Sequence, residues 1–106
     1  MTRTLIVARM DAARAPEVAR LFEESDSTEL PHLIGVSQRS LFSFHDLYFH
    51  LIEAGDDLRT RLHAARTNPL YSELNEQLSE FIKPYSPDWR GPADAMARSF
   101  YSWQAA

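Results

Sequence analysis

The stretch from Arg39 to Glu53, RSLFSFHDLYFHLIE, places an arginine and a histidine within two apolar runs that predict a β-hairpin. Side chains alternate between the two faces of a strand, so the length of the turn decides which residues share a face. With a two-residue turn at His45-Asp46, Arg39 and His50 project from the same face. A turn of odd length sends one of them to the other face. Two ionisable groups inside a sheet suggest a functional site.

The two-residue turn also fixes which side chains lie across from one another. Leu41 then faces His50 and Arg39 faces Ile52, which leaves the arginine and the histidine diagonal neighbours, about 7–8 Å apart at the backbone. That separation is within reach of one small ligand. Four further residues of this face are expected to contact such a ligand: Leu41, Ser43, Tyr48 and Ile52.

The first half of the chain predicts one strand, one helix and then the hairpin. Residues 3–10 form a short apolar and β-branched run, and residues 11–24 carry Val18, Leu21 and Phe22 at helical spacing. Residues 25–35, SDSTELPHLIG, break this pattern. The hairpin strands are expected at residues 36–44 and 47–54, followed by Gly55-Asp56-Asp57, where an aspartate can cap the next helix.

The second half predicts a helix in two pieces and a last strand. Leucines recur at helical spacing before and after Thr67-Asn68-Pro69, where asparagine is a natural cap with proline behind it. Residues 83–95 hold three prolines and a glycine and predict a loop, whereas residues 96–104, MARSFYSWQ, alternate and predict a strand. The order βαββαβ indicates an α+β, ferredoxin-like fold: an antiparallel sheet with helices on one face.

Length and charge limit the classes of protein that the chain can belong to. A chain of 106 residues is expected to form one domain, residues 1–106, and the absence of cysteine excludes disulfides and thiolate chemistry, which fits a cytoplasmic location. No stretch approaches the ~20 apolar residues that a membrane span needs. With 15 acidic and 11 basic residues and a net charge of −4, nucleic acid is a poor candidate partner.

A sheet covered on one face leaves its other face to be buried in some other way. The predicted last strand carries Phe100, Tyr101 and Trp103, which are too apolar for a solvated edge. A homodimer is the economical solution.

Several motifs together resemble one family of enzymes. They are RMD at 9–11, STELP at 27–31, IGV at 34–36, FHDLYFHLIEA at 44–54, NP at 68–69 and FYSW at 100–103. The sequence resembles the tetracenomycin-type aromatic polyketide cyclases along nearly its whole length. The resemblance implies a cofactor-free enzyme of type II polyketide synthesis, for an antibiotic or a pigment, with a dimeric α+β barrel architecture. It would close a late ring of an aromatic polyketide intermediate by aldol condensation and dehydration, working with a minimal polyketide synthase or acyl carrier protein.

The resemblance also implies a set of catalytic residues. In this chain they are Asp26, Arg39 and His50, while Ser25 stands where the family has a histidine. A neutral imidazole with a pKa of about 6.5 suits His50 to the role of base, and the guanidinium of Arg39 can hold an enolate oxygen. Asp26 can receive a proton or orient a neighbour.

Structural explanations compete with these catalytic roles. His50 can be a satisfied core residue, Arg39 can pair with Glu53 or Asp26, and Asp26 can be an ordinary turn carboxylate. The other histidines, His32, His45 and His63, are expected to be solvated, and no spacing supports a metal site. At the level of function, a cofactor-independent monooxygenase and a non-catalytic polyketide-binding or assembly subunit are the alternatives.

Overall fold

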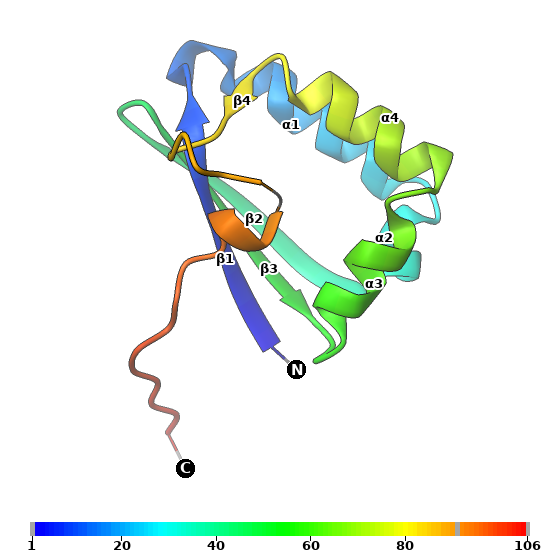
Figure 1. Ribbon diagram of the computed structural model, residues 1–106, viewed down its shortest axis with the longest axis vertical. Coiled ribbons are helices and arrows are strands. Elements are labelled where there is room, and N and C mark those ends of the chain that lie inside the picture. Colours follow the sequence, from blue (N-terminus) through cyan, green and yellow to red (C-terminus); the bar gives the residue numbers. More distant parts are fainter. Residues whose placement is uncertain (1, 91, 106) are drawn as a thin grey trace.

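The computed structural model describes residues 2–90 and 92–105, and its centre is a four-stranded antiparallel sheet (Figure 1). The strands lie in the order β2-β3-β1-β4. Their bounds are β1 Thr2–Met10, β2 Val36–Phe44, β3 Leu47–Ala54 and β4 Ile82–Lys83. This strand order, with helices in the two crossovers, confirms the expected ferredoxin-like α+β fold.

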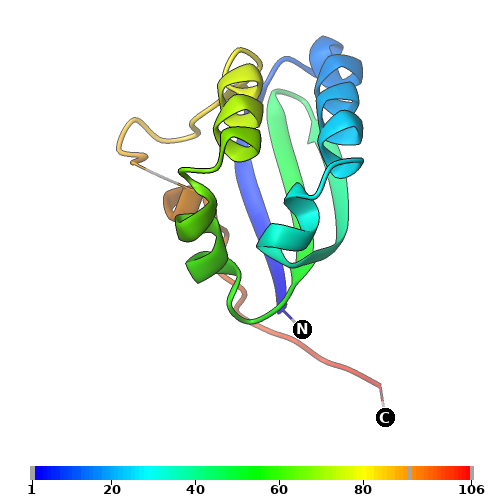
Figure 2. The same cartoon turned by 90° about the vertical axis from the view of Figure 1, so that its right-hand side faces the viewer.

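The helices all lie on one face of the sheet, as Figures 1 and 2 show from two directions. In this layer α1 packs beside α4 and α2 beside α3. The α-helices are α1 Ala15–Asp26, α2 Leu30–Ile34, α3 Leu58–Ala65 and α4 Pro69–Leu78, and short 3₁₀ helices occupy Ala12–Arg14 (η1) and Pro92–Ala95 (η2).

The hairpin has the register that a two-residue turn requires. Leu41 pairs with His50 and Arg39 with Ile52, so the expected geometry is confirmed. The turn places His45 at a φ of 54°, in the left-handed region. The register shifts only at the far end of β2, between Val36 and Gln38, where the strand carries a bulge.

Local sequence signals mark the start of α4 and the end of α2, whereas Asp57, the N-cap residue of α3, makes no side-chain capping hydrogen bond. The Asn68 side chain accepts from the Leu70 amide at 2.8 Å and caps α4, as expected. Residues 25–35, where the helical pattern of the sequence breaks, contain the last two residues of α1 and the short helix α2. Pro31 stands in its first turn and Gly35 ends it at a φ of 83°. A helix this short shows too little periodicity to be recognised.

The expectation of a last strand at residues 96–104 is wrong. The fourth strand is β4, which pairs with the Arg9-Met10 end of β1, and the later segment contributes only a bridge from Met96 to Ile6 and a bond from the Ala97 amide to the Leu5 carbonyl at 2.7 Å. Alternation creates a strand only where a partner strand is available. Beyond Ala97 the chain leaves the sheet on the side away from the helices (Figures 1 and 2).

Two apolar clusters fill the space between the helices and the sheet. One gathers around Val18, Phe22 and Tyr48, and the other around Ile52 and Leu58. Among the described residues, His50 is the buried polar side chain of this core. No helix within residues 2–90 or 92–105 is long and apolar enough to cross a membrane.

Candidate active site

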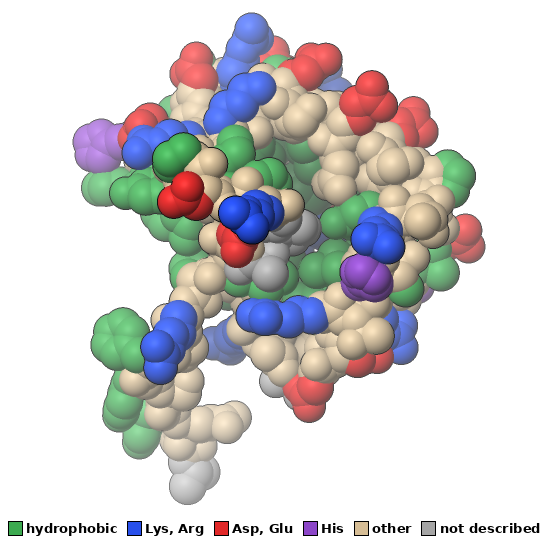
Figure 3. All heavy atoms as spheres, in the orientation of Figure 1, with side chains coloured by type: hydrophobic (Ala, Val, Ile, Leu, Met, Phe, Trp, Pro, Cys, Tyr) green, Lys and Arg blue, Asp and Glu red, His purple; other side chains and the backbone are tan. Residues whose placement is uncertain are grey.

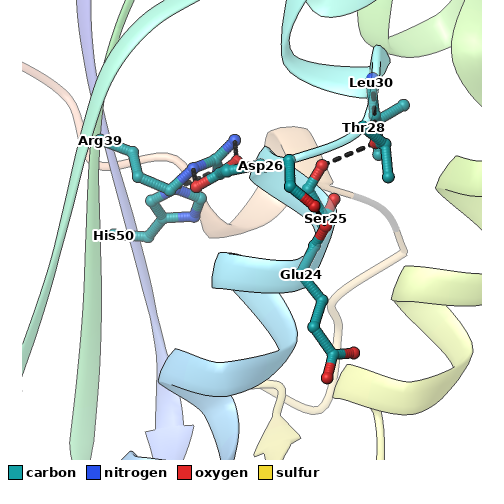
Figure 4. A network of polar contacts seen from close by, with 8 residues as sticks. Glu24, Ser25, Asp26, Thr28, Leu30, Arg39 and His50 are labelled. Atoms are coloured by element: carbon teal, nitrogen blue, oxygen red, sulfur yellow. Dashed lines mark hydrogen bonds and ion pairs between the residues drawn. The ribbon is translucent and has the colours of Figure 1, made fainter.

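Arg39 is held between a carboxylate and an imidazole (Figure 4). Its Nε donates to Asp26 Oδ2 at 3.0 Å, and its Nη2 lies 2.8 Å from Asp26 Oδ1. On the other side its Nη1 lies 3.0 Å from His50 Nε2. The guanidinium also lies over the Phe22 ring, 5.0 Å from the centroid. The end of α1 and strands β2 and β3 therefore meet at one arginine.

The contact between Arg39 and His50 fixes the tautomer of the imidazole. A guanidinium has five N–H donors and no acceptor, so Nε2 of His50 accepts and the ring proton lies on Nδ1. Asp26 engages Nε and Nη2, and His50 engages one N–H of Nη1. Among the described residues, one N–H on each terminal nitrogen of Arg39 has no partner and can bind a ligand oxygen.

The surroundings of His50 keep the imidazole neutral. Its exposed fraction is 6%, and its ring meets the edge of Phe22 with centroids 5.0 Å apart. Burial, with the charge of Arg39 added, lowers the pKa of His50 to about 3. This value lies well below the reference pKa of about 6.5 for an imidazole in water. Burial also raises the pKa of Tyr48, on the same face of β3, so its hydroxyl stays protonated and can donate.

An apolar cavity of about 620 Å³ lies between the sheet and the helices, a size typical of small-molecule sites. Arg39, Tyr48, His50 and Ile52 form part of its sheet wall. Strands β1 and β4 of the same sheet also contribute to this wall, and the other walls come from α1 to α4 and the segment that follows β4. Figure 3 shows the molecule hollowed here, with hydrophobic side chains inside and both basic and acidic side chains near the opening.

The residues predicted for the site do not all line this cavity. Asp26 and Leu41 line a shallower hollow on the other side of Arg39. Ser43 lines neither space and is exposed, because it lies close to the hairpin turn at the end of β2. Ser25 also lines neither space, and Figure 4 shows it on the far side of Asp26 from His50. The face of a strand can be predicted from alternation, but the part of that face that the helices enclose cannot.

Two of the structural explanations match the observed contacts: His50 is a buried side chain with a hydrogen-bond partner, and Arg39 forms an ion pair. Arg39 pairs with Asp26, whereas Glu53 pairs with Arg3 at 2.8 Å. Together with the contact to His50, this ion pair leaves two N–H donors of Arg39 without a partner among the described residues, so it does not exclude a catalytic role. His32, His45 and His63 are exposed, as expected. Within the described ranges, no group of three His, Asp or Glu side chains is placed to hold a metal ion.

Sequence reasoning missed the helical side of the cavity. Leu62 and Arg66 line it four residues apart, as do Tyr71 and Asn75 on α4, and Trp89 contributes from the segment after β4. The spacing of four residues places each pair on one face of a helix, which is a signal that the sequence does contain. The hairpin alone could not identify them, because they belong to the opposite wall.

The comparisons with known proteins agree with this arrangement of fold and cavity. Residues 2–104 match the model of the polyketide synthesis cyclase family. The chain is 53% identical to tetracenomycin F2 cyclase of Streptomyces glaucescens over 103 residues, covering 97% of this chain and 94% of the relative. It is 44% identical over 105 residues to the polyketide synthase CurG of Streptomyces cyaneus, covering 98% of each. The chain belongs to the polyketide synthesis cyclase family.

A solved structure supports the same assignment. The structure of tetracenomycin F2 cyclase from Streptomyces glaucescens, described as a type-II polyketide cyclase, matches with a TM-score of 0.93 and 52% identity over the whole of both chains. The chain is therefore a polyketide cyclase, an enzyme of polyketide biosynthesis that catalyses ring closure.

Proposed function

We propose that this enzyme closes a late ring of an aromatic poly-β-ketone intermediate by aldol condensation and dehydration. The observation that carries the proposal is Arg39, which is fixed at the wall of an apolar cavity with two N–H donors unused. Such donors stabilise the negative oxygen of an enolate, and they do so best where water is excluded. The cavity also supports a second contribution to the rate, because it confines a flexible polyketide to a few reactive conformations.

The proposed chemistry begins at a carbon between two carbonyl groups. In the resting site Arg39 occupies the lone pair of His50 Nε2, so the imidazole becomes a base when that N–H turns to the substrate oxygen. His50 then takes the carbon-bound proton while Arg39 holds the enolate oxygen. The enolate carbon attacks a second carbonyl and forms the ring bond. The resulting alkoxide receives the proton from His50.

Dehydration completes the aromatic ring in this proposal. A second proton leaves the carbon next to the new carbinol, the hydroxyl departs with a proton, and one water is released. Burial and the charge of Arg39 both disfavour the protonated form of His50. The imidazolium that forms during the reaction is therefore a strong acid and returns its proton readily. Asp26 acts as a positioning residue through its two contacts with Arg39. Tyr48 and Ile52 contact the substrate from the same wall.

Reconstitution tests the proposed reaction. A minimal polyketide synthase is incubated with and without the enzyme, and products are identified by mass spectrometry and NMR. We expect the enzyme to shift uncyclised or wrongly cyclised products to one compound that has lost one water. Oxygen uptake coupled to turnover would instead indicate a monooxygenase. An unchanged product profile from an enzyme that still binds the intermediate would indicate a non-catalytic binding subunit.

We also propose that the enzyme is a homodimer, joined through the face of the sheet that the helices leave open. That face is apolar across three strands, with Leu5, Val7, Phe42, Phe44, Leu47, Phe49 and Leu51. Phe42 and Phe44 are 54% and 62% exposed in the single chain, and Phe100, Tyr101 and Trp103 extend on the same side at 76–95% exposed. Exposed apolar surface of this extent is typical of an interface.

Light scattering after gel filtration tests the dimer. We expect the wild-type enzyme to have the mass of two chains and Phe42→Glu to have the mass of one. Leu33→Glu is the matched control, because Leu33 is an exposed apolar residue, 43% exposed, on the helical side of the molecule. A wild-type enzyme with the mass of one chain would contradict the proposal.

A further inference from the structure

The charged side chains that line the cavity are of one sign. Among the described residues that line it, three are cationic, namely Arg39, Arg66 and Lys83, and none is an aspartate or a glutamate. The chain as a whole carries a net charge of −4. The cavity is thus a positive region in an acidic protein, and low-dielectric walls strengthen its attraction for an anion.

Two of these three cations are already engaged within the chain. Arg39 is neutralised by Asp26, at contacts of 2.8 and 3.0 Å, and Lys83 Nζ donates to the Ser79 carbonyl at 2.5 Å. For Arg66, the part of the chain that the structure describes provides neither an ion pair nor a side-chain hydrogen bond. Of the three, Arg66 is therefore the cation whose side-chain N–H donors all lack a partner among the described residues.

Arg66 lies on the opposite wall from the site at Arg39. It is the residue at which α3 ends, and its side chain is exposed while still lining the cavity together with Leu62, Tyr71 and Asn75. Arg39, on the sheet wall, has 15% of its side chain exposed. Because Arg39 and Arg66 line the same cavity, a substrate that spans it can contact both side chains.

We propose that Arg66 binds the terminal anionic group of the substrate while Arg39 holds the reacting oxygen. The group has oxyanion chemistry that two sources can supply: the carboxylate of a released polyketide acid, or the phosphate of the phosphopantetheine arm of a carrier protein. A guanidinium suits both, since its paired N–H donors match two oxygens of either anion. The inference rests on the proposed function. It adds that the substrate is an anion that contacts Arg66 at one wall and Arg39 at the other.

Calorimetric titration with four probes separates the two sources. The probes are anthraquinone-2-carboxylate, its uncharged methyl ester, 4′-phosphopantetheine and uncharged pantetheine. Arg66→Ala is compared with Arg59→Ala, a matched control on the same helix α3, because Arg59 is exposed and does not line the cavity. Circular dichroism checks that both variants unfold at the temperature of the wild type.

We expect Arg66→Ala to weaken the binding of an anionic probe about tenfold and to leave the binding of its uncharged partner unchanged. A tenfold loss corresponds to one charge-assisted hydrogen-bonded contact. Loss confined to the carboxylate identifies a released acid as the substrate, and loss confined to 4′-phosphopantetheine identifies a carrier-bound one. Equal effects of Arg66→Ala and Arg59→Ala, or equal losses for charged and uncharged probes, would overturn the inference. Because binding is measured without turnover, a failure of the cyclisation assay remains a separate result.

Discussion

The two faces of the hairpin use alternate residues of the same strands for different purposes. On the covered face Arg39, His50 and Ile52 are buried or half-buried against helices and the cavity. On the open face Phe42 and Phe44 are more than half exposed in the single chain. Neighbours in sequence therefore differ completely in environment, because the period of a strand is two.

The difference shows how this fold separates chemistry from association. The covered face holds single polar groups whose positions depend on specific partners, as Arg39 does between Asp26 and His50. The open face holds apolar side chains that any complementary apolar surface could cover. We expect substitutions on the first face to change the reaction and those on the second to change the assembly.

The largest expected effect is on the rate of cyclisation when Arg39 is replaced. Arg39→Met should lower kcat by about 10²–10³, the usual cost of losing an oxyanion donor. Arg39→Lys should retain only part of the wild-type kcat, since an ammonium cannot reproduce the paired contacts with Asp26. Arg9→Met is the control from the open face, where Arg9 pairs with Asp46 at 2.7 Å. Equal kcat for Arg39→Met and Arg9→Met would remove the distinction between the faces.

The next effect concerns stability and compares two adjacent residues. Ile52→Ala should lower the free energy of unfolding by about 3 kcal/mol, because Ile52 lies in the core and is only 4% exposed. Leu51 lies on the open face, so Leu51→Ala should cost about 1 kcal/mol in the single chain. Urea unfolding at several protein concentrations distinguishes them. The cost of Leu51→Ala should rise with concentration as a homodimer buries it, and equal, concentration-independent costs would contradict the comparison.

A smaller effect is expected where Asp26 positions Arg39. Asp26→Asn should lower kcat about tenfold with little change in KM, because Arg39 keeps its contact with His50 but loses a charged partner. Stability should hardly change, since 38% of the Asp26 side chain is exposed. Ser25→Ala is the control on the neighbouring residue. A loss of activity in Ser25→Ala as large as in Asp26→Asn would show that Ser25 takes part in the site.

Much of the fold could be predicted because its signals are local. Alternation and turn length determined the register of the hairpin, and Asn68-Pro69 determined where α4 begins. The fourth strand was misplaced because two segments compete for the free edge of β1. The pair Ile82–Lys83 occupies that edge with only two residues, too few to show any period, whereas the longer aromatic segment 96–104 leaves the sheet.

The candidate site could be predicted only along its strands. Strand periodicity placed Arg39 and His50 together, but it could not show which atoms meet, and the pKa of His50 depends on that contact and on burial. Asp26 was assigned from the family resemblance and not from any local pattern. Arg66 and Asn75 reach the cavity through the packing of helices on the sheet, which is a tertiary property.

The last prediction concerns the pH dependence that the covered face gives to the protein. His50, faced by Arg39 and Tyr48 with Asp26 behind the arginine, has a pKa of about 3 when folded and about 6.5 when unfolded. Between these values the unfolded chain binds the extra proton, so the free energy of unfolding should fall as pH falls, by up to about 1.4 kcal/mol per pH unit. Urea unfolding between pH 7 and 4.5 should show this slope in the wild type and in His63→Gln, whose histidine is exposed, and a shallower slope in His50→Gln. Parallel profiles for all three proteins would mean that His50 titrates normally, and the imidazole would then be free to carry protons near neutral pH without first being released by Arg39.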